Sequence, residues 1–235
     1  MAWVAFAVLA FACGAIPFGL ILSRMRGMDI RKHGSGNIGA TNVWRVMGAR
    51  LGLLCFVLDV VKGLAPTLAA GWWMGLVRSG VEARPIATGD AWPWLGVMAA
   101  AVMGHMFTPL AGFKGGKGVA TGLGAMLGVW PYLTLPAAGV FVVWVAVAAA
   151  WRYVSLASCV AAVSLPVMVV VLPRLWGVGL GLRDAVPFLA VSGLLALLVV
   201  VRHRTNIGRL LKGTENRIGK KTAPVQGPGD SHPPR

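Results

Sequence analysis

The chain has 235 residues, of which 57% are apolar and only 12% charged, and its mean hydropathy is +0.75. A soluble domain carries about 25% charged residues, so the sequence excludes an ordinary soluble enzyme, a disordered chain and a disulfide-rich secreted scaffold. Lys and Arg outnumber Asp and Glu by 22 to 7. In so apolar a chain, this excess indicates cytoplasmic anchoring loops and a site for anions rather than nucleic-acid binding.

Apolar stretches long enough to cross a bilayer recur along the chain and predict an all-α, polytopic bundle of transmembrane helices. The expected spans are 3–23, 51–77, 92–112, two spans within 119–151, 153–175 and 185–201. As one straight helix, residues 119–151 would be about 50 Å long, well beyond the hydrocarbon thickness. We therefore expect a break near Trp130–Pro131, because proline interrupts a helix.

The distribution of positive charge predicts which end of each span faces the cytoplasm. Lys and Arg follow the first span rather than precede it, which places the N-terminus outside and argues against a cleavable signal peptide. With seven spans, the fourth short or re-entrant, the basic C-terminal residues lie in the cytoplasm and residues 78–90 outside. Residues 1–221 are expected to form one membrane domain, and residues 222–235, rich in Pro and Gly, a disordered tail.

The first of three polar segments on the cytoplasmic side, residues 34–45, contains a Gly-x-Gly-x-x-Gly pattern. That pattern indicates dinucleotide binding only between a strand and a helix, so we reject that interpretation here. Glycines still allow backbone N–H groups to approach a phosphate, and Arg45 offers a two-pronged guanidinium. Other candidate ligands in this segment are Ser35, Gly36, Asn37, Gly39, Thr41 and Asn42. The alternative is an ordinary polar loop with Arg45 in solvent.

The second segment, residues 113–121, is similar to a Walker A loop but has Gly118 after Lys117, where Ser or Thr is required. Nucleotide hydrolysis is therefore not expected. Lysines among glycines at the start of an apolar helix can nevertheless bind phosphate, because the helix dipole adds to the cationic charge. The candidates here are Lys114, Gly115, Gly116, Lys117 and Gly118. Anchoring of the membrane edge by the two lysines stays open as the alternative.

The third segment, residues 202–215, places His203 and Asn206 at i,i+3 on one helical face. Three arginines surround them in the sequence, namely Arg202, Arg204 and Arg209, for which Glu215 could act as counter-ion. His203 could equally be a structural hydrogen-bond donor at the membrane boundary.

Polar residues also occur inside or beside the expected spans. Asp59 and Lys62 can neutralise each other within the second span, either at a functional site or as a structural pair that supports the loops. Arg152 and Ser155 lie at the cytoplasmic entrance of the sixth span, where Ser155 could line the site or bond to its own helix. The sequence contains three cysteines, all in apolar context: Cys13, Cys55 and Cys159. They show no metal-ligand spacing and imply no disulfide framework.

Taken together, the three segments resemble those of the bacterial membrane acyltransferases that transfer a fatty acyl group from acyl-phosphate to glycerol 3-phosphate. The first family motif, Ser-Gly-Asn-x-Gly-x-x-Asn-x-x-Arg, is matched at Ser35, Gly36, Asn37, Gly39, Asn42 and Arg45. The second, Gly-Gly-Lys-Gly-Val-Ala-Thr, is matched by residues 115–121. The third is matched at His203, Arg204, Asn206, Ile207, Arg209, Leu210, Gly213 and Glu215. The resemblance covers about residues 1–217.

The resemblance implies an enzyme that acylates the 1-hydroxyl of sn-glycerol 3-phosphate, giving lysophosphatidic acid and phosphate in phospholipid synthesis. It also implies a multi-pass protein of the bacterial inner membrane with its active site facing the cytoplasm. Expected partners are the two substrates and membrane lipid, with no nucleic acid, no obligate protein partner, no cofactor and no metal. A transporter or channel for an organic phosphate is the alternative from another class, and a structural membrane scaffold is a third.

The candidate residues divide into three roles. Catalytic candidates are Ser35, Asn37, Arg45, Lys117, His203 and Asn206. Substrate-binding candidates are Gly36, Gly39, Thr41, Asn42, Lys114, Gly115, Gly116, Gly118, Arg152, Ser155, Arg204 and Arg209. Structural support is expected from Asp59, Lys62 and Glu215. Since the sequence has no Gly-x-Ser-x-Gly elbow, Ser35 is interpreted as a hydrogen-bond donor rather than a nucleophile. Whether His203 or a phosphate oxygen of the substrate is the general base stays open.

Overall fold

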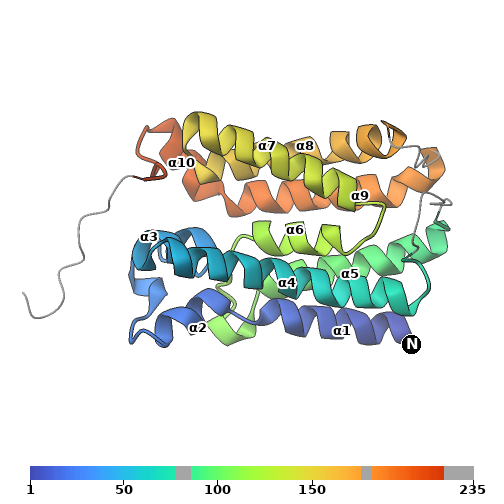
Figure 1. Cartoon of the computed structure of the whole chain (residues 1–235), viewed down its shortest axis with the longest axis horizontal. Helices are drawn as coiled ribbons and strands as arrows, with labels where there is room; N and C mark the ends of the chain where they lie inside the picture. The colour runs from blue at the N-terminus through green and yellow to red at the C-terminus, as the bar shows by residue number, and fades with distance from the viewer. Residues whose placement is uncertain (78–85, 176–181, 220–235) are drawn as a thin grey trace, which may run out of the picture.

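In a computed structural model, residues 1–77, 86–175 and 182–219 are described, and their regular elements are all helices (Figure 1). The helices are α1 (Ala2–Ala15), α2 (Phe18–Arg24), η1 (Ile30–Lys32), α3 (Ala40–Met47), α4 (Ala49–Trp73), α5 (Thr88–Met106), η2 (Pro109–Ala111), α6 (Val119–Leu127), α7 (Thr134–Trp151), α8 (Val154–Leu175), α9 (Leu182–Arg202) and α10 (Arg204–Leu211). The long helices lie side by side in a bundle. The prediction of an all-α bundle is therefore confirmed.

Within these described ranges, six helical segments are long and apolar enough to cross a membrane. They are Ala2–Arg24, Ala49–Trp73, Thr88–Ala111, Thr134–Trp151, Val154–Leu175 and Arg183–Arg202. The break expected near Trp130–Pro131 is confirmed, since it falls between α6 and α7. With only 9 residues, α6 extends about 14 Å and is too short to cross the hydrocarbon core alone. The seven-span count and the side on which each end lies stay predictions.

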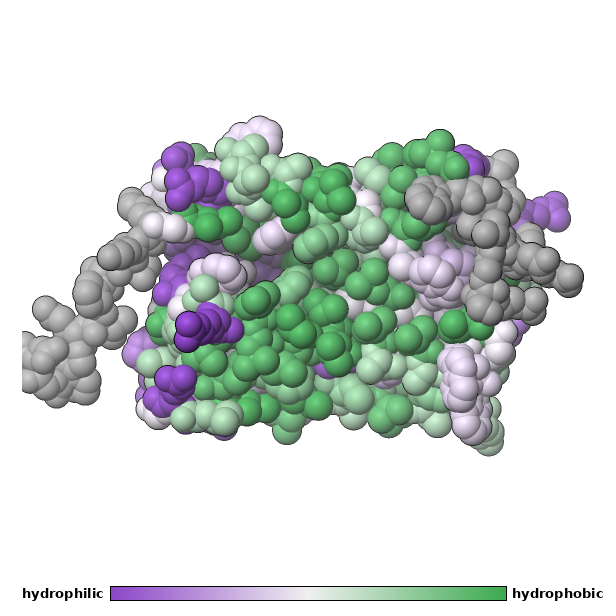
Figure 2. All heavy atoms as spheres, viewed as in Figure 1, coloured by the Kyte–Doolittle hydropathy of each residue, from purple (hydrophilic) through white to green (hydrophobic). Residues whose placement is uncertain are grey.

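The polar parts of the chain gather at one end of the bundle. In Figure 1 the N-terminus of α1 lies at the opposite end from α3 and α10. Figure 2 shows an apolar band across the middle of the visible face and hydrophilic residues at the end where α3 and α10 lie. This distribution suits a bundle whose middle is in contact with lipid and whose polar end is in contact with water.

The break between α1 and α2 is stabilised by side chains from other elements. The carbonyl of Ala15 accepts a hydrogen bond from Thr108 Oγ1 at 2.5 Å, and that of Ile16 accepts one from Lys62 Nζ at 2.7 Å. Lys62 Nζ also lies 2.7 Å from Asp59 Oδ1, and both side chains are 3% exposed. The two charges therefore neutralise each other inside the bundle, and Lys62 supplies a donor to backbone that the helix break leaves open.

Close packing of α6 against α4 depends on glycines. A Cβ added at Gly124 would lie 1.9 Å from the carbonyl oxygen of Val60, and one added at Gly128 would lie 2.9 Å from that of Leu64. Gly124 and Gly128 have the i,i+4 spacing of small residues that favours close helix packing, and both lie against α4. A similar pair at 177–181 lies outside the described residues.

Candidate active site

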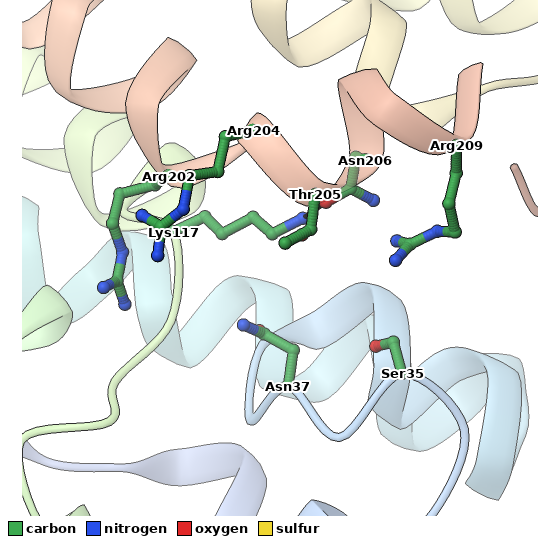
Figure 3. A pocket seen from close by; sticks show the side chains of 8 residues that line it. All are labelled: Ser35, Asn37, Lys117, Arg202, Arg204, Thr205, Asn206 and Arg209. Atoms are coloured by element: carbon green, nitrogen blue, oxygen red, sulfur yellow. Dashed lines mark hydrogen bonds between the residues drawn. The ribbon is translucent and has the colours of Figure 1, made fainter. Parts of the chain in front are cut away.

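Side chains from all three polar segments line one pocket of about 190 Å³ at the polar end of the bundle (Figure 3). The lining residues are Ser35, Asn37, Lys117, Arg202, Arg204, Thr205, Asn206 and Arg209. Ser35 and Asn37 form one side, here called the uncharged wall. The opposite side, here called the cationic wall, consists of Lys117 and the lining residues of α9 and α10. In Figure 3 the two walls face each other across the pocket.

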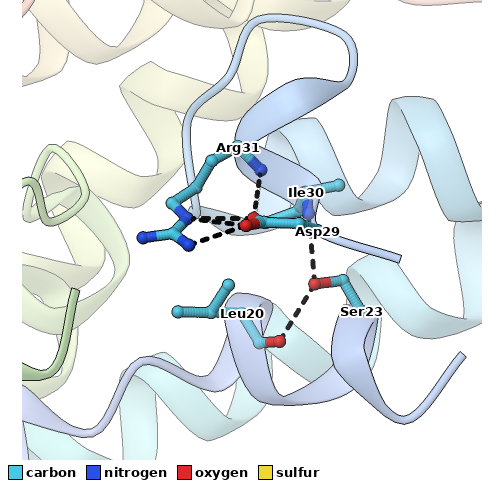
Figure 4. Close-up of polar contacts among 5 residues, drawn as sticks. All are labelled: Leu20, Ser23, Asp29, Ile30 and Arg31. Carbon is cyan, nitrogen blue, oxygen red and sulfur yellow. Dashed lines mark hydrogen bonds and ion pairs between the residues drawn. The ribbon is translucent and has the colours of Figure 1, made fainter. Parts of the chain in front are cut away.

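A turn between α2 and η1 brings the first segment back toward the bundle (Figure 4). Ser23 Oγ donates to the carbonyl of Leu20 at 2.9 Å and accepts from the backbone N–H of Ile30 at 3.3 Å. Asp29 pairs with Arg31, with 2.6 Å between Oδ2 and Nη2. The hydrogen bonds from Arg31 hold the pKa of the Asp29 carboxyl below its usual range. These local contacts set the direction in which the chain enters the uncharged wall.

Asn42 organises the uncharged wall from inside. Asn42 is buried, with 2% of its surface exposed. Its Oδ1 accepts from the backbone N–H of Ser35 at 2.8 Å, and its Nδ2 donates to the carbonyls of His33 at 3.0 Å and Asn37 at 2.9 Å. Asn37 Oδ1 in turn accepts from the N–H of Gly39 at 2.8 Å. Asn42, a substrate-binding candidate, is therefore occupied with shaping the loop and does not line the pocket.

The remaining candidates of the first segment lie around this loop. Gly36 has a φ of +70°, a conformation that favours glycine, and Thr41 is exposed on α3. Arg45, also on α3, is half-buried but is not among the lining residues. Burial lowers the pKa of Arg45, and the nearby carboxylate of Glu215 opposes that shift. Arg45 thus lies close enough to the third segment to interact electrostatically with it.

The glycine–lysine loop, residues 112–118, is laid against the end of α5. The N–H of Gly115 donates to the carbonyl of Met106 and that of Gly116 to His105, both at 3.2 Å. A Cβ at Gly116 would lie 2.1 Å from His105 Nε2, so the loop can approach α5 this closely only with glycine there. These two N–H groups are consequently engaged within the protein and are not directed at an anion.

Lys117 is the lysine of this loop that reaches the pocket, whereas Lys114 is exposed and does not line it. Lys117 Nζ donates a short hydrogen bond to Asn206 Oδ1 on α10. Burial lowers the pKa of Lys117 to about 8; the charge of Glu215 opposes this shift and that of Arg209 adds to it. Lys117 therefore keeps its proton through neutral pH but is easier to deprotonate than an exposed lysine.

Glu215 connects the elements behind the cationic wall. Its side chain is 5% exposed and accepts hydrogen bonds from Ser155 Oγ at 2.9 Å, Asn206 Nδ2 at 2.6 Å and Arg209 Nε at 2.7 Å. Burial acts to raise the pKa of Glu215, but these hydrogen bonds outweigh it and lower the pKa. The carboxylate thus stays ionised and fixes the orientation of Asn206, which in turn accepts from Lys117.

His203 is buried at the junction of α9 and α10 and does not line the pocket. Its Nδ1 lies 2.8 Å from the carbonyl of Val199, which favours the neutral tautomer with hydrogen on Nδ1. Burial lowers the pKa of His203 to about 4, and the charge of Lys117 adds to that shift. The imidazole is therefore neutral at pH 7.

Two arginines differ from expectation in where they lie. Arg152 Nη2 donates to the carbonyl of Ile218 at 2.8 Å, and the carbonyl of Arg152 accepts from the N–H of Ile218 at 2.7 Å. This pairing ties the segment after α10 to the α7–α8 turn, away from the pocket lining. Arg202, which the sequence marks only as a neighbouring charge, does line the pocket, as does Thr205. The sequence feature that could have indicated Arg202 and Thr205 is their position beside His203 in the third segment.

The family model described as "Glycerol-3-phosphate acyltransferase" matches residues 4–213. The chain belongs to the glycerol-3-phosphate acyltransferase family. It is 41% identical over 212 residues to a glycerol-3-phosphate acyltransferase of Geobacter sulfurreducens, covering 89% of this chain and 94% of the relative. It is also 41% identical over 218 residues to one of Rhizobium meliloti, with 91% of each chain covered.

Solved structures agree with this assignment. The chain is similar to crystal structures of PlsY, an integral membrane glycerol 3-phosphate acyltransferase, in a glycerol 3-phosphate form and a lysophosphatidic acid form. The TM-scores are 0.75 and 0.73, with 36% identity, and each match covers 93% of this chain and 96% of the other. The glycerol-3-phosphate acyltransferase assignment decides against the transporter and scaffold alternatives.

The described residues contain no group of three or more His, Cys, Asp or Glu that could hold a metal ion. Whether the reaction requires a metal is a question for the assay, and the expectation that it does not stays a prediction. The domain boundary at residue 221 also stays a prediction, because residues 220–235 lie outside the described part of the chain.

Proposed function

We propose that this glycerol-3-phosphate acyltransferase takes its acyl group from acyl-phosphate and transfers it to the 1-hydroxyl of glycerol 3-phosphate, releasing lysophosphatidic acid and inorganic phosphate. The observation that supports the proposal is the single pocket shared by all three segments, with Ser35 and Asn37 facing one lysine and three arginines. Phosphate groups fit this arrangement because Lys and Arg form charge-assisted hydrogen bonds with them. Both substrates of the proposed reaction carry a phosphate.

The balance of charge supports two anionic substrates rather than one. The pocket is lined by four cations, Lys117, Arg202, Arg204 and Arg209, and the carboxylate of Glu215 pairs with one of them, Arg209. A cleft lined by an excess of positive charge attracts anions and raises their local concentration. We assign glycerol 3-phosphate to Lys117 and the start of α6, where the helix dipole adds to the lysine charge.

The proposed reaction needs no covalent enzyme intermediate. The 1-hydroxyl oxygen attacks the carbonyl carbon of the acyl-phosphate, the carbon–oxygen bond to phosphate breaks, and the phosphate leaves with the bonding electron pair. Ser35 and Asn37 on the uncharged wall supply hydroxyl and amide donors for the oxyanion that forms on the carbonyl. The cationic wall stabilises the leaving phosphate.

The hydroxyl proton needs an acceptor, for which His203 and a substrate phosphate oxygen are the two candidates. The pKa of His203, lowered to about 4 by burial, makes its imidazole a weak base. The second pKa of a phosphate monoester is about 6, so a phosphate oxygen is a stronger base than this imidazole. We accordingly propose that a substrate phosphate oxygen accepts the proton and that His203 fixes the junction between α9 and α10.

We further propose that the protein is a multi-pass inner-membrane enzyme whose pocket faces the cytoplasm. The pocket lies at the polar end of the bundle, opposite the N-terminus, and Lys and Arg accumulate on the cytoplasmic side of membrane proteins. A pocket there is open to water-soluble glycerol 3-phosphate, and the adjacent apolar bundle surface can hold the acyl chain in lipid. No protein partner is required for this chemistry.

The test uses the full chain purified in lipid nanodiscs with glycerol 3-phosphate and, separately, acyl-phosphate, acyl-CoA and acyl-carrier protein bearing the same acyl group. Acyl-phosphate is expected to give lysophosphatidic acid and inorganic phosphate in equal amounts, while the thioesters give no turnover above background. Turnover with acyl-CoA equal to that with acyl-phosphate would disprove the choice of donor.

A second arm tests the direct transfer. Radiolabelled acyl-phosphate is incubated with the protein in the absence of glycerol 3-phosphate, and the protein is then denatured and separated from free label. We expect no acyl group bound to the protein. Stoichiometric label that is lost in a Ser35→Ala variant would instead identify Ser35 as a nucleophile.

A further inference from the structure

The geometry points to Arg202 as a positioning residue that holds the glycine–lysine loop in its catalytic place, through hydrogen bonds to loop carbonyls rather than through contact with a substrate phosphate. Arg202 is the last residue of α9. Its Nη2 donates to the carbonyls of Gly116 at 2.8 Å, Gly115 at 3.0 Å and Met106 at 3.3 Å. Its guanidinium also lies over the ring of Phe107, 5.6 Å from the centroid.

These contacts join parts of the chain that are distant in sequence. Gly116 and Arg202 are separated by 86 residues, and the three carbonyls belong to the end of α5 and to the loop that follows it. In Figure 3 the Arg202 side chain lies beside that loop, at the side of the pocket away from Ser35 and Arg209. Arg202 therefore connects the third segment directly to the backbone of the second.

The loop has particular need of such a contact because of its composition. Residues 112–118 include four glycines, and glycine loses more conformational freedom on ordering than any other residue. The N–H groups of Gly115 and Gly116 are already bonded to α5, and the carbonyls of the same two residues are bonded to Arg202. Lys117 follows directly, so a displacement of Gly116 would move Lys117 relative to Asn206.

The other arginines of the pocket are placed to bind phosphate, whereas Arg202 is placed to hold the loop. Arg209 is paired with Glu215 and Arg204 is exposed, so both can present N–H groups to a ligand. Arg202 instead has one nitrogen directed at three carbonyl oxygens and its charge placed over an aromatic ring. A guanidinium separates the two contacts, with Nη2 at the carbonyls and Cζ over the ring, whereas a lysine ammonium carries its charge and all its N–H donors on one atom.

The decisive variant is Arg202→Lys, because it keeps the positive charge of the cationic wall and removes the guanidinium. We expect kcat/KM to fall about 10- to 100-fold, the range for loss of charge-assisted hydrogen bonds. The matched control is Lys212→Gln, which removes an exposed charge at the same end of the molecule; its kcat/KM should match the wild type. Thermal unfolding of both variants verifies that they are folded.

The pH dependence of kcat/KM distinguishes a positioning role from a loss of stability, because a loss of stability alone would not shift the pKa of Lys117. Because the low pKa of Lys117 results first from burial, a loop released from Arg202 should return Lys117 toward water. The alkaline limb of kcat/KM for glycerol 3-phosphate should then shift above its wild-type position near pH 8. The charged or titratable groups that face Lys117 are unchanged in this variant; they are Glu215, Arg209, Cys159, Arg45 and His203.

Three results would overturn the proposal. Wild-type kcat/KM in Arg202→Lys would show that the charge alone suffices. A rise in KM for one substrate with unchanged kcat and an unchanged alkaline limb would show that Arg202 binds that substrate. If Arg202→Lys does not fold, the Phe107→Leu variant is the test. Loss of the cation–π contact should lower kcat/KM about 2- to 5-fold and shift the alkaline limb to higher pH. An unshifted limb in this variant refutes the proposal.

The inference rests on the acyltransferase activity and not on the choice of donor. Every rate is therefore expressed relative to the wild type measured with the same donor. If acyl-phosphate is not the donor, the wild type itself will show no turnover with it. The Arg202→Lys variant is then compared with the wild type using the donor that the wild type accepts.

Discussion

The two walls of the pocket are held in place by contacts of different range. In the uncharged wall, Asn42 bonds to residues between 5 and 12 positions away, so the loop is shaped by residues close to it in the sequence. In the cationic wall, Lys117 bonds to Asn206 across 89 residues and Ser155 bonds to Glu215 across 60. One wall is thus a local motif, and the other is a product of the assembled bundle.

This difference has a consequence for substitutions. A change in the uncharged wall should alter one loop and leave phosphate binding largely intact. A change in the cationic wall should affect a network that joins the glycine–lysine loop, α8 and α10, because its members share partners and their effects are not additive.

Lys117→Ala should have the largest effect on activity. It removes a charge-assisted contact with glycerol 3-phosphate and leaves Asn206 Oδ1 without its donor, so kcat/KM should fall about 10- to 150-fold. Steady-state kinetics with each substrate varied in turn measures the change, with Lys32→Ala as a control for an exposed charge at the same end. A defect confined to the acyl donor would reverse the assignment of the two substrates.

Asn42→Ala should damage the uncharged wall. The N–H of Ser35 and the carbonyls of His33 and Asn37 would lose their partner, and each buried group left unpaired costs about 1–3 kcal/mol. We expect a lower Tm and a lower kcat, with KM for glycerol 3-phosphate changed less than in Lys117→Ala. The exposed Asn216→Ala serves as the control. An equal rise in that KM in the two variants would show that the walls are not separable.

The pH dependence of kcat/KM should report the protonation state of Lys117 in the cationic wall. A Lys117 pKa of about 8 means that the protonated, phosphate-binding form is lost as the pH rises through 8. Above that value kcat/KM should fall about tenfold per pH unit. His203, with a pKa of about 4, stays neutral above pH 5 and adds no change there. A Lys117→Met variant should lack the limb, and a wild-type limb near pH 10 would contradict the burial of Lys117.

Much of this architecture follows from short-range features of the sequence. Apolar runs specify the helices, Pro131 marks the break between α6 and α7, and glycines at 124 and 128 indicate the packing of α6. Periodicity does not reveal which polar residues meet across the bundle, because that depends on how the helices are placed. Arg152 and Arg202 illustrate this: both lie at ends of long helices, yet one binds Ile218 and the other the glycine–lysine loop.

Lys114→Ala should have the smallest effect, and it tests whether Lys114, a substrate-binding candidate from the sequence, contacts a substrate. Lys114 and Lys117 are separated by two glycines, and of the two only Lys117 lies within the matched motif. Gly115 and Gly116 are bonded to the end of α5, so the loop turns there, leaving Lys114 exposed while Lys117 lines the pocket. An exposed charge outside the pocket is screened by water and salt, so kcat/KM should change less than about threefold at 0.15 M salt, as expected from ~0.5 kcal/mol. The effect should grow when the ionic strength is reduced, as it would for long-range attraction of anionic substrates. A loss comparable to that of Lys117→Ala at both ionic strengths would place Lys114 on a substrate phosphate and extend the cationic wall to the outer end of the loop.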